Sequence, residues 1–509
     1  SKALTFSSAV CFIRLVAPQN IKPLRDFRTP TVAPPMVEVP AEGCRDGQQV
    51  ANRHLEVVWM CSGEVACVVE ITPSVTIADL RSQVMKSTGV PAEQQKLFSE
   101  GRELLLKQIV VSTMVGARGP DTKVPDMKCP AMIQLVRCHS DPRNTNRGFF
   151  RENLQLPEKV VGNFRRVRKI GNAIYGEVSR YQWIKETETE DVAVKCISVQ
   201  KARQSLEKDT NEWTAHQSSH NIPNPEDAYA EIGVLQYLAK QPDLPAYLSK
   251  LLAAFVEDSK IWLVMELADG ELLDAVLSQK VVDASQTRRY LWQTLQAVKY
   301  LHAHYIGHRD ISLENLLLKD GDIRLVDFGN AVQSHSSSGQ ELRYFLTVGK
   351  DTYRAPECIV PHRASVPVMV PDDASAEDII MHRESSGLYQ VRLPKSAIRG
   401  TFCQAEVWGY AAQPADIFSC GVCFFCMSYG NGPWIQAQLT DEFFAYVIDH
   451  HDGLKDLLRH WGKPLLETEA MDLLLDMIRI DPLRRPAASS CLESNWFRDQ
   501  HGDIEMLPA

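Results

Sequence analysis

Five short motifs in one order constrain the fold of this chain more than any other feature of its sequence. Each motif alone is weak evidence, because hairpins need glycine for ordinary steric reasons and a lysine that ends a strand is usually solvated. All five together are much harder to explain by chance. We therefore expect their charged residues to converge on one site. The motifs are Gly171-Asn-Ala-Ile-Tyr-Gly176, Val192-Ala-Val-Lys195, His308-Arg-Asp-Ile-Ser-Leu-Glu-Asn315, Asp327-Phe-Gly329 and Ala355-Pro-Glu357.

In this order the motifs resemble those of the eukaryotic protein kinase family. The resemblance extends over about residues 163–498, and we predict a kinase domain at 163–500. It implies a bilobal α+β fold with a β-rich N-lobe and a helical C-lobe. It also implies transfer of the ATP γ-phosphoryl group to a protein hydroxyl, with ATP and Mg²⁺ as cofactors.

The resemblance implies a role for each charged residue of the motifs. Asp310 would orient the substrate hydroxyl and accept its proton. Lys195 would contact the α- and β-phosphates of ATP, which carry several negative charges. Asn315 and Asp327 would hold Mg²⁺, because hard oxygen ligands suit that ion. The predicted catalytic set is Asp310, Lys195, Asn315 and, for a reason given below, Lys350.

The nucleotide would lie between the glycine-spaced turn and a hinge. Glycine lets the backbone approach the phosphates, although Ala173 stands where the family has a third glycine. Met265 resembles the residue before the hinge, whose backbone would bind adenine. The expected partner of Lys195 is Glu231, whereas Glu212 lies in a polar stretch and is the poorer choice. The predicted nucleotide-binding set is Gly171, Ala173, Gly176, Val178, Ala193, Lys195, Glu231, Met265, Glu266 and Ala268.

One pair of positions departs from the serine/threonine branch of the family. That branch usually has Lys two residues after the catalytic Asp, where this chain has Ser312. It usually has Thr before the Ala-Pro-Glu motif at the place of Lys350. We therefore hypothesise that the two residues are exchanged and that Lys350 supplies the positive charge near the γ-phosphate. The alternative is that Lys350 is simply solvent-exposed.

Further positions match the supporting frame of the family. Asp416 would anchor the catalytic loop, and Arg485 would form a buried bridge with Glu357. Arg309 would pair with a phosphate or another anion of the activation segment, unless the serine tract there is only a flexible loop. The candidate phosphorylation sites are Ser334, Ser336, Ser337, Ser338 and Thr347. The expected apolar spine between the lobes is Leu235, Leu251, His308 and Phe328.

The stretch between Glu357 and Asp416 is longer than the family normally uses. We predict a surface insertion at about residues 361–400, rich in Pro, Ser and charge. It could control access of substrates. Because long surface insertions cost little free energy, the interpretation as padding is favoured.

Residues 51–139 predict a separate α+β domain. Alternating apolar residues predict a strand at 65–71, and Ile77, Leu80 and Val84 form one helical stripe. The stretches 73–80, 89–95 and 97–104 resemble ubiquitin, which implies a β-grasp docking domain. A long insertion at Lys107–Pro130 and the lack of a Gly-Gly tail are departures, so conjugation is not the expected role. Phe98 could belong to an exposed apolar patch or to the core.

The two remaining segments resemble linkers. Residues 1–50 are rich in proline and turn residues and are predicted to be a disordered tail or linker. Their first 25 residues contain no acidic side chain, so a weak likeness to an organelle transit peptide stays open. Residues 140–162 are polar and are predicted to connect the two domains.

Composition narrows the functional class and the compartment. The formal charge of −9 argues against a nucleic-acid-coating protein, and no apolar run approaches the roughly 20 residues of a membrane helix. The 13 cysteines favour a reduced intracellular compartment, which we take to be the cytoplasm. Cys420, Cys423 and Cys426 have the spacing of iron–sulfur ligands, but a buried apolar helix is the favoured interpretation.

The sequence thus predicts an ATP- and Mg²⁺-dependent protein kinase with an N-terminal ubiquitin-like docking domain. Ser/Thr specificity is favoured, because Ser312-Leu-Glu-Asn315 lacks the Arg-containing catalytic loop of the tyrosine branch. The expected partners are protein substrates and a protein that binds the docking domain, with no nucleic acid and no membrane span. The alternative is a pseudokinase scaffold that binds partners without phosphoryl transfer, and the feature in its favour is Ser312.

Overall fold

The structure is a computed structural model of the 509-residue chain. It describes six elements between residues 53 and 137, and residues 142–498 apart from 144, 146–149, 151–153, 155, 158–161, 207–211, 214, 215, 217–225, 280, 281, 337, 338 and 386. Contacts divide the chain into two units, residues 31–141 and residues 142–509 with 1–30. The predictions for residues 1–50, for Lys107–Pro130 and for the Phe98 side chain lie outside the described residues.

The N-terminal unit is a mixed five-stranded sheet with one helix. The strand order is β2-β1-β5-β3-β4, with β1 parallel to β5 and antiparallel to β2. Leu80 and Val84, one helical turn apart, are fully buried on α1, as the apolar stripe predicts. This arrangement is compatible with a β-grasp, and the ubiquitin-like identity stays a prediction. The elements are β1 (Arg53–Trp59), β2 (Val65–Ile71), α1 (Ile77–Thr88), β3 (Gln95–Ser99), β4 (Arg102–Glu103) and β5 (Ile133–Arg137).

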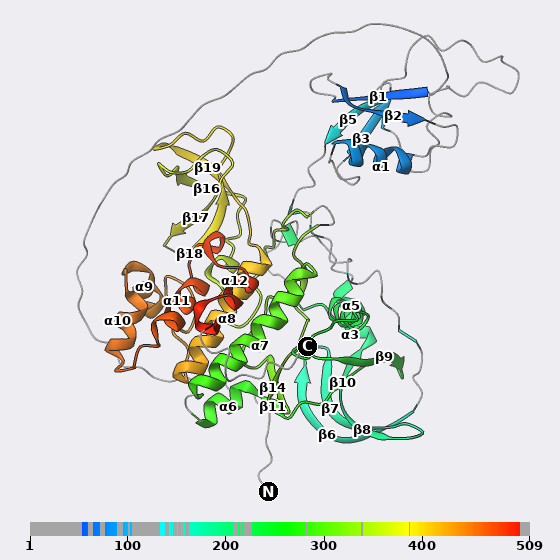
Figure 1. The fold of residues 1–509 in the computed structure, drawn as a ribbon, viewed down its shortest axis with the longest axis vertical. Helices are drawn as coiled ribbons and strands as arrows, with labels where there is room; N and C mark the ends of the chain where they lie inside the picture. The colour runs from blue at the N-terminus through cyan, green and yellow to red at the C-terminus, as the bar shows by residue number, and fades with distance from the viewer. Residues whose placement is uncertain are drawn as a thin grey trace, which may run out of the picture. The chain divides into compact units, whose positions relative to one another are not determined.

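The larger unit begins with an antiparallel sheet of five strands, in the order β6-β7-β8-β10-β9 (Figure 1). One face of this sheet carries an aromatic cluster in which Phe164 lies between Trp183 and Phe255, at ring-centroid distances of 5.3 and 5.6 Å. Helices α3 (Val199–Leu206) and α5 (Ala228–Ala239) pack against the sheet. The strands are β6 (Asn163–Ala173), β7 (Gly176–Ile184), β8 (Thr189–Ser198), β9 (Leu251–Glu257) and β10 (Lys260–Glu266).

Helix α5 is held in place at its start and along its buried side. Asp227 caps it by accepting hydrogen bonds from the backbone N–H groups of Tyr229 and Ala230 at 3.0 and 3.1 Å. Phe150 lies against the same helix, and a Cβ added to Gly233 would come within 2.0 Å of the Phe150 carbonyl oxygen. The described residues of the stretch predicted to be a linker thus pack onto the larger unit.

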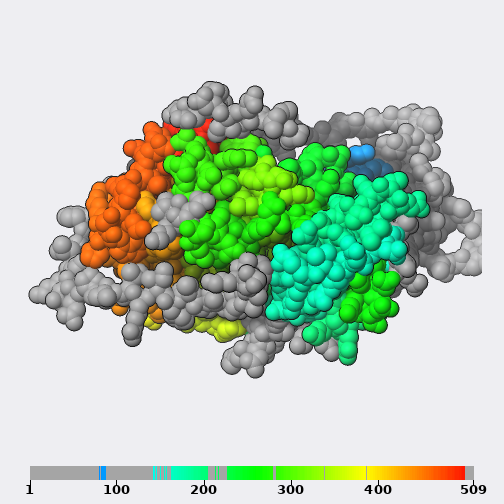
Figure 2. Space-filling model, turned by 90° about the horizontal axis from the view of Figure 1, so that it is seen from below, coloured from blue at the N-terminus to red at the C-terminus, as the bar shows by residue number. Residues whose placement is uncertain are grey.

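The second lobe is helical, and Figure 2 shows it (green to orange) beside the teal surface of the first lobe. Its central helix α8 packs against α7 and α11 and is buried along almost its whole length. Arg485 bridges Glu357 with two hydrogen bonds of 2.5 and 2.8 Å, both side chains being fully buried. The helices are α6 (Leu272–Gln279), α7 (Ala284–Ala303), α8 (Ala412–Tyr429), α9 (Glu442–Asp449), α10 (Gly453–His460), α11 (Thr468–Met477), α12 (Ala488–Leu492) and α13 (Asn495–Arg498).

The three cysteines at iron–sulfur spacing lie inside helix α8. Cys420, Cys423 and Cys426 are free and buried, and burial raises the pKa of each thiol. Within the described residues, no group of three or more His, Cys, Asp or Glu side chains could hold a metal ion. The three cysteines of α8 therefore pack as small apolar side chains. No helix in the described part of the chain is long and apolar enough to cross a membrane.

The predicted insertion folds as a four-stranded antiparallel sheet with the order β16-β19-β18-β17 (Figure 1). Its valines join the main core, because Val366 and Val368 alternate with exposed positions on β16 and are buried together with Val391 and Val407. The ordered sheet extends past residue 400 to Val407. Its strands are β16 (Ser365–Met369), β17 (Ile379–Glu384), β18 (Gly387–Arg392) and β19 (Phe402–Val407).

The contact between Phe150 and helix α5 yields a stability prediction. Gly233→Ala would raise helix propensity, yet we expect it to lower the free energy of unfolding by about 1–3 kcal/mol, because the new methyl group overlaps the Phe150 carbonyl. Urea denaturation measures the change. Gly270→Ala is the control, since a Cβ there meets nothing within 4 Å. A stabilised Gly233→Ala variant would show that Phe150 does not lie against α5.

Candidate active site

The predicted catalytic loop lies between β12 (Ile306–Gly307) and β13 (Leu316–Lys319) and is held in place by helix α8. Asp416 accepts hydrogen bonds from the backbone N–H groups of His308 and Arg309 at 2.8 and 2.7 Å. This support matters because Arg309 has a φ of 63°, a left-handed conformation that costs free energy for a residue with a side chain. The buried carboxylate thus sets the direction in which Asp310 leaves the loop.

Lys195 of strand β8 meets Glu231 of helix α5. The Lys195 Nζ donates hydrogen bonds to both Glu231 carboxylate oxygens at 2.6 and 2.8 Å, and both side chains are buried. Burial disfavours the charged form of Lys195, but Glu231 and Asp327 outweigh it and raise the lysine pKa. The ammonium group therefore stays charged at neutral pH.

Asp327 approaches the same lysine from the other lobe. Its Oδ1 lies 3.7 Å from the Lys195 Nζ, and the backbone N–H of Gly329 donates to that oxygen at 3.3 Å. Burial acts against ionisation of Asp327, but Lys195 and the Gly329 N–H outweigh burial and hold its pKa below the ordinary value. The next side chain, Phe328, packs against His308 at a ring-centroid distance of 5.2 Å.

Asn315 and Asp310 are joined within the loop. The Asn315 Nδ2 donates to the Asp310 carbonyl at 2.8 Å and to its Oδ2 at 3.1 Å. Because the amide nitrogen is engaged in this way, the amide oxygen is the atom that Asn315 can offer to a cation. With the ionised carboxylate of Asp327 it forms a donor set of oxygens, which fits Mg²⁺. Burial raises the pKa of Asp310 above that of an ordinary Asp.

Lys350 and Ser312 lie next to each other beside Asp310. The Lys350 Nζ donates to the Ser312 Oγ at 2.8 Å and lies 3.6 Å from the Asp310 Oδ2. The Lys350 backbone N–H also donates to the Asp310 Oδ1 at 3.2 Å. The Lys350 ammonium group thus lies beside two residues of the predicted catalytic loop.

The glycine-spaced turn joins β6 and β7, and its two glycines lie in different surroundings. Around Gly171 nothing lies within 4 Å of an added Cβ, so the backbone there is open to a ligand. At Gly176 a Cβ would come within 1.8 Å of the Cys196 carbonyl oxygen, so strand packing alone requires this glycine. Ala173 pairs directly with Gly176 at the end of the hairpin.

The remaining predicted nucleotide positions lie on neighbouring strands. Val178 pairs with Lys195 between β7 and β8, and Ala193 pairs with Met265 between β8 and β10. The Glu266 side chain is occupied, because Lys319 and Arg324 approach its carboxylate oxygens at 2.7 and 3.3 Å. Its backbone N–H is also engaged, since it donates to the Lys250 carbonyl at 3.2 Å. Val178, Ala193, Met265 and Ala268 are half-buried.

The expected spine and phosphorylation sites have varied surroundings. Leu235, His308 and Phe328 are buried, and Leu251 is half-buried. Ser334 is buried and accepts a hydrogen bond from the Gln413 Nε2 at 2.9 Å. Ser336 is half-buried, Thr347 is exposed, and Ser337 and Ser338 lie outside the described residues.

Two acidic residues lie at the site without a motif that predicts their contacts. Glu212, the poorer of the two candidate partners of Lys195, instead pairs with Arg309 at 3.2 Å. Glu226 directly precedes the cap of α5, and burial together with Asp327 raises its pKa to about 7. The polar stretch that contains Glu212 and Glu226 has no residue spacing that predicts where either side chain lies. Both positions depend on long-range folding of the chain toward the catalytic loop.

Comparison with known proteins agrees with this geometry. A family model described as protein kinase domain matches residues 164–370. The chain is 27% identical over 274 residues to the serine/threonine-protein kinase CHK1 of Saccharomyces cerevisiae, covering 53% of this chain and 42% of that protein. It is 25% identical over 271 residues to CBL-interacting serine/threonine-protein kinase 7 of Arabidopsis thaliana, covering 53% and 49%.

A third relative extends the similarity further along this chain. The carbon catabolite-derepressing protein kinase of Candida tropicalis is 24% identical over 354 residues, covering 69% of this chain and 44% of that protein. The chain thus spans less than half the length of each of these three curated relatives. Residues 164–370 thus match a protein kinase domain, and the relatives that align with this chain are named as protein kinases.

Proposed function

We propose that this protein transfers the γ-phosphoryl group of ATP to serine or threonine hydroxyls of protein substrates, with Mg²⁺ as the metal. The observation that carries the proposal is that Lys195, Glu231 and Asp327 form one charged cluster while Asp310 and Asn315 are joined in the adjacent loop. Two lobes contribute to this site, as expected of an enzyme that aligns a triphosphate between them.

The charges of these residues match the steps of phosphoryl transfer. Lys195, kept in place by Glu231, would bind the α- and β-phosphates, while Asp327 and Asn315 would hold the metal. Bound Mg²⁺ would supply charge neutralisation at the phosphate oxygens. Asp310 would accept a hydrogen bond from the substrate hydroxyl and take its proton as the new bond to phosphorus forms.

The position of Lys350 argues against an inactive scaffold. Ser312 leaves the catalytic loop without its usual lysine, which is the feature that favours a pseudokinase. The Lys350 ammonium, 2.8 Å from Ser312 and 3.6 Å from Asp310, supplies a positive charge at the same place. It would stabilise the charge that develops on the transferred group. We also propose that the N-terminal unit binds a protein partner and that the protein is located in the cytoplasm.

Asp310→Asn tests the enzymatic activity. Because the amide cannot accept the hydroxyl proton, we expect transfer to fall by about 10²–10⁴-fold with Mg-ATP binding retained. Labelled phosphate transferred from ATP to Ser/Thr and to Tyr peptide libraries measures the rate and the specificity. Asp472→Asn, an exposed site on α11, is the control for the charge change. Mg-ATP binding with no transfer above the Asp310→Asn level would instead indicate a pseudokinase.

Lys350→Met tests the exchanged lysine. We expect kcat to fall by about 10²–10³-fold, because a preorganised charge is removed from the site of transfer. The acidic limb of the pH–rate profile should also shift to higher pH. Lys350 lowers the pKa of Asp310, so its loss raises that pKa, and the base then becomes protonated at a higher pH.

The control for this variant is Lys395→Met, an exposed lysine of the insertion, which should behave as the unmodified enzyme. Lys350→Arg keeps the positive charge and should leave the acidic limb near its original position. An unchanged rate and an unchanged pH profile in Lys350→Met would show that this lysine does not take part in transfer.

A further inference from the structure

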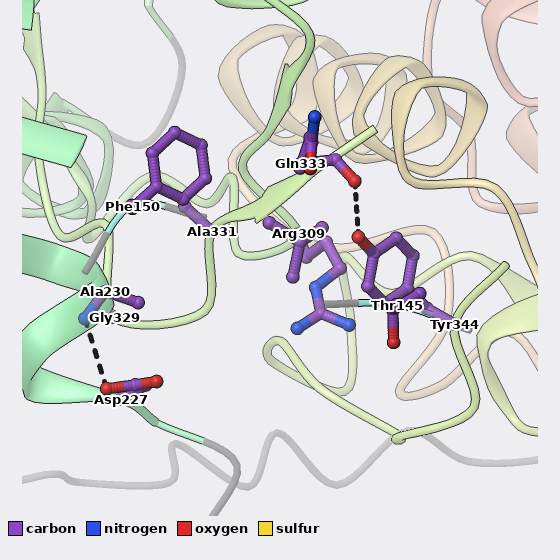
Figure 3. A pocket seen from close by; sticks show the side chains of 10 residues that line it. Thr145, Phe150, Asp227, Ala230, Arg309, Gly329, Ala331, Gln333 and Tyr344 are labelled. Atoms are coloured by element: carbon purple, nitrogen blue, oxygen red, sulfur yellow. Dashed lines mark hydrogen bonds between the residues drawn. The ribbon is translucent and has the colours of Figure 1, made fainter. Parts of the chain in front are cut away.

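The catalytic loop carries a buried cation that needs a negative partner. The Arg309 guanidinium is buried between the start of the activation segment and Tyr344, as Figure 3 shows. Its Nε donates to the Asn330 carbonyl at 2.8 Å, its Nη1 donates to the Tyr410 hydroxyl at 3.1 Å, and its Cζ lies 4.7 Å from the Tyr344 ring centroid. These contacts are to neutral groups, and an unpaired buried charge is strongly destabilising.

Glu212 supplies the negative charge, and its side chain is 0% exposed. The Arg309 Nη1 lies 3.2 Å from the Glu212 Oε1 and 3.5 Å from the Oε2. The Oε2 also accepts hydrogen bonds from the backbone N–H groups of Phe345 and Leu346 at 3.0 and 3.1 Å. One carboxylate therefore joins the catalytic loop to the backbone of the activation segment.

The surroundings of Glu212 are packed on both sides. The Trp213 ring lies 4.6 Å from the Phe345 ring, and the His216 ring lies 5.4 Å from it. On the other side, His216 stacks on His362 at 4.6 Å, and its Nε2 lies within hydrogen-bonding distance, 3.3 Å, of the Val360 carbonyl. The stretch containing Glu212 is thus held between the activation segment and the start of the insertion.

A phosphate on the activation segment would make the same contacts, because it offers several acceptor oxygens and negative charge to an arginine. Of the described candidate sites, Ser334, Ser336 and Thr347, none is among the hydrogen-bond partners of the Arg309 side chain, which are Asn330, Tyr410 and Glu212. Ser334 is buried and hydrogen-bonded to Gln413, and Thr347 is exposed to solvent. The position beside Arg309 is already filled by a carboxylate from a distant part of the chain.

We propose that Glu212 is a positioning residue that replaces the activation-segment phosphate. It holds Phe345 and Leu346 against Arg309 and so orders the segment that carries Lys350, without phosphorylation. The inference rests on the proposed kinase function and adds its mode of control. Glu212 precedes α5, which carries Glu231, so the anion that orders the segment comes from a part of the sequence that lies before the motifs of both the catalytic loop and the activation segment.

The experiment compares the full-length protein, before and after treatment with a broad-specificity phosphatase, with Glu212→Gln and Glu212→Asp. Glu469→Gln, an exposed site on α11, is the matched control. Three quantities are measured: kcat for peptide phosphorylation, the Kd for Mg-ATP, and amide hydrogen exchange at Phe345 and Leu346. The exchange measurement needs no activity, so it decides the role of Glu212 even if no phosphoryl transfer is found.

We expect phosphatase to change kcat by less than about twofold, because no phosphate holds the segment. Glu212→Gln should lower kcat at least about tenfold and speed exchange at Phe345 and Leu346, with the Kd for Mg-ATP and exchange in α7 and α8 unchanged. Glu212→Asp, which keeps the charge, should be intermediate.

Two results would overturn the proposal. One is a loss of kcat on phosphatase treatment of the unmodified protein, a test that does not depend on any variant folding. The other is Glu212→Gln with normal kcat and normal protection at Phe345 and Leu346. If the unmodified protein transfers no phosphate yet Glu212→Gln loses that protection, the proposed function fails while the ordering role of Glu212 stands.

Discussion

The site depends on one buried carboxylate, that of Asp416 in helix α8. By accepting from two successive backbone N–H groups at 2.8 and 2.7 Å, it holds the catalytic loop through the left-handed turn at Arg309. From this turn the Asp310 side chain points to the proposed site of phosphoryl transfer, whereas the Arg309 side chain points to the activation segment. Helix α8, which is buried along almost its whole length, thus supplies the reference point for the site.

Buried charges at the site occur as pairs whose members come from distant parts of the chain. Lys195 meets Glu231, 36 residues later in the sequence, and Arg309 meets Glu212, 97 residues earlier. Such pairs do not add much net stability, since desolvation offsets most of their attraction. Their effect is on specificity, because each charge is satisfied in one arrangement of the elements, and that arrangement assembles the site.

The described residues of the predicted linker and the predicted insertion both pack onto the rest of the larger unit. Phe150 lies against helix α5 at Gly233, and Arg343 of the activation segment donates its backbone N–H to the Pro142 carbonyl at 2.9 Å. The insertion has a buried valine layer, and its first residues stack against His216. Both stretches therefore contact the elements that position the activation segment. Composition alone cannot show this, because polar, proline-containing sequence is typical of linkers and of packed surface strands alike.

The sequence by itself determined which charged groups are the candidates for the proposed chemistry, because Lys195, Asp310, Asn315 and Asp327 belong to short motifs whose spacing is local. It also pointed to the neighbouring positions of Ser312 and Lys350 through the family pattern. Only the tertiary structure decided which anion meets Arg309. Glu212 lies far from it in the sequence, in a polar stretch with no motif, and the contact exists because chain closure brings the two together in a buried site where a lone arginine is too costly. Local patterns specify which groups are present, while long-range packing selects the partner of each buried charge.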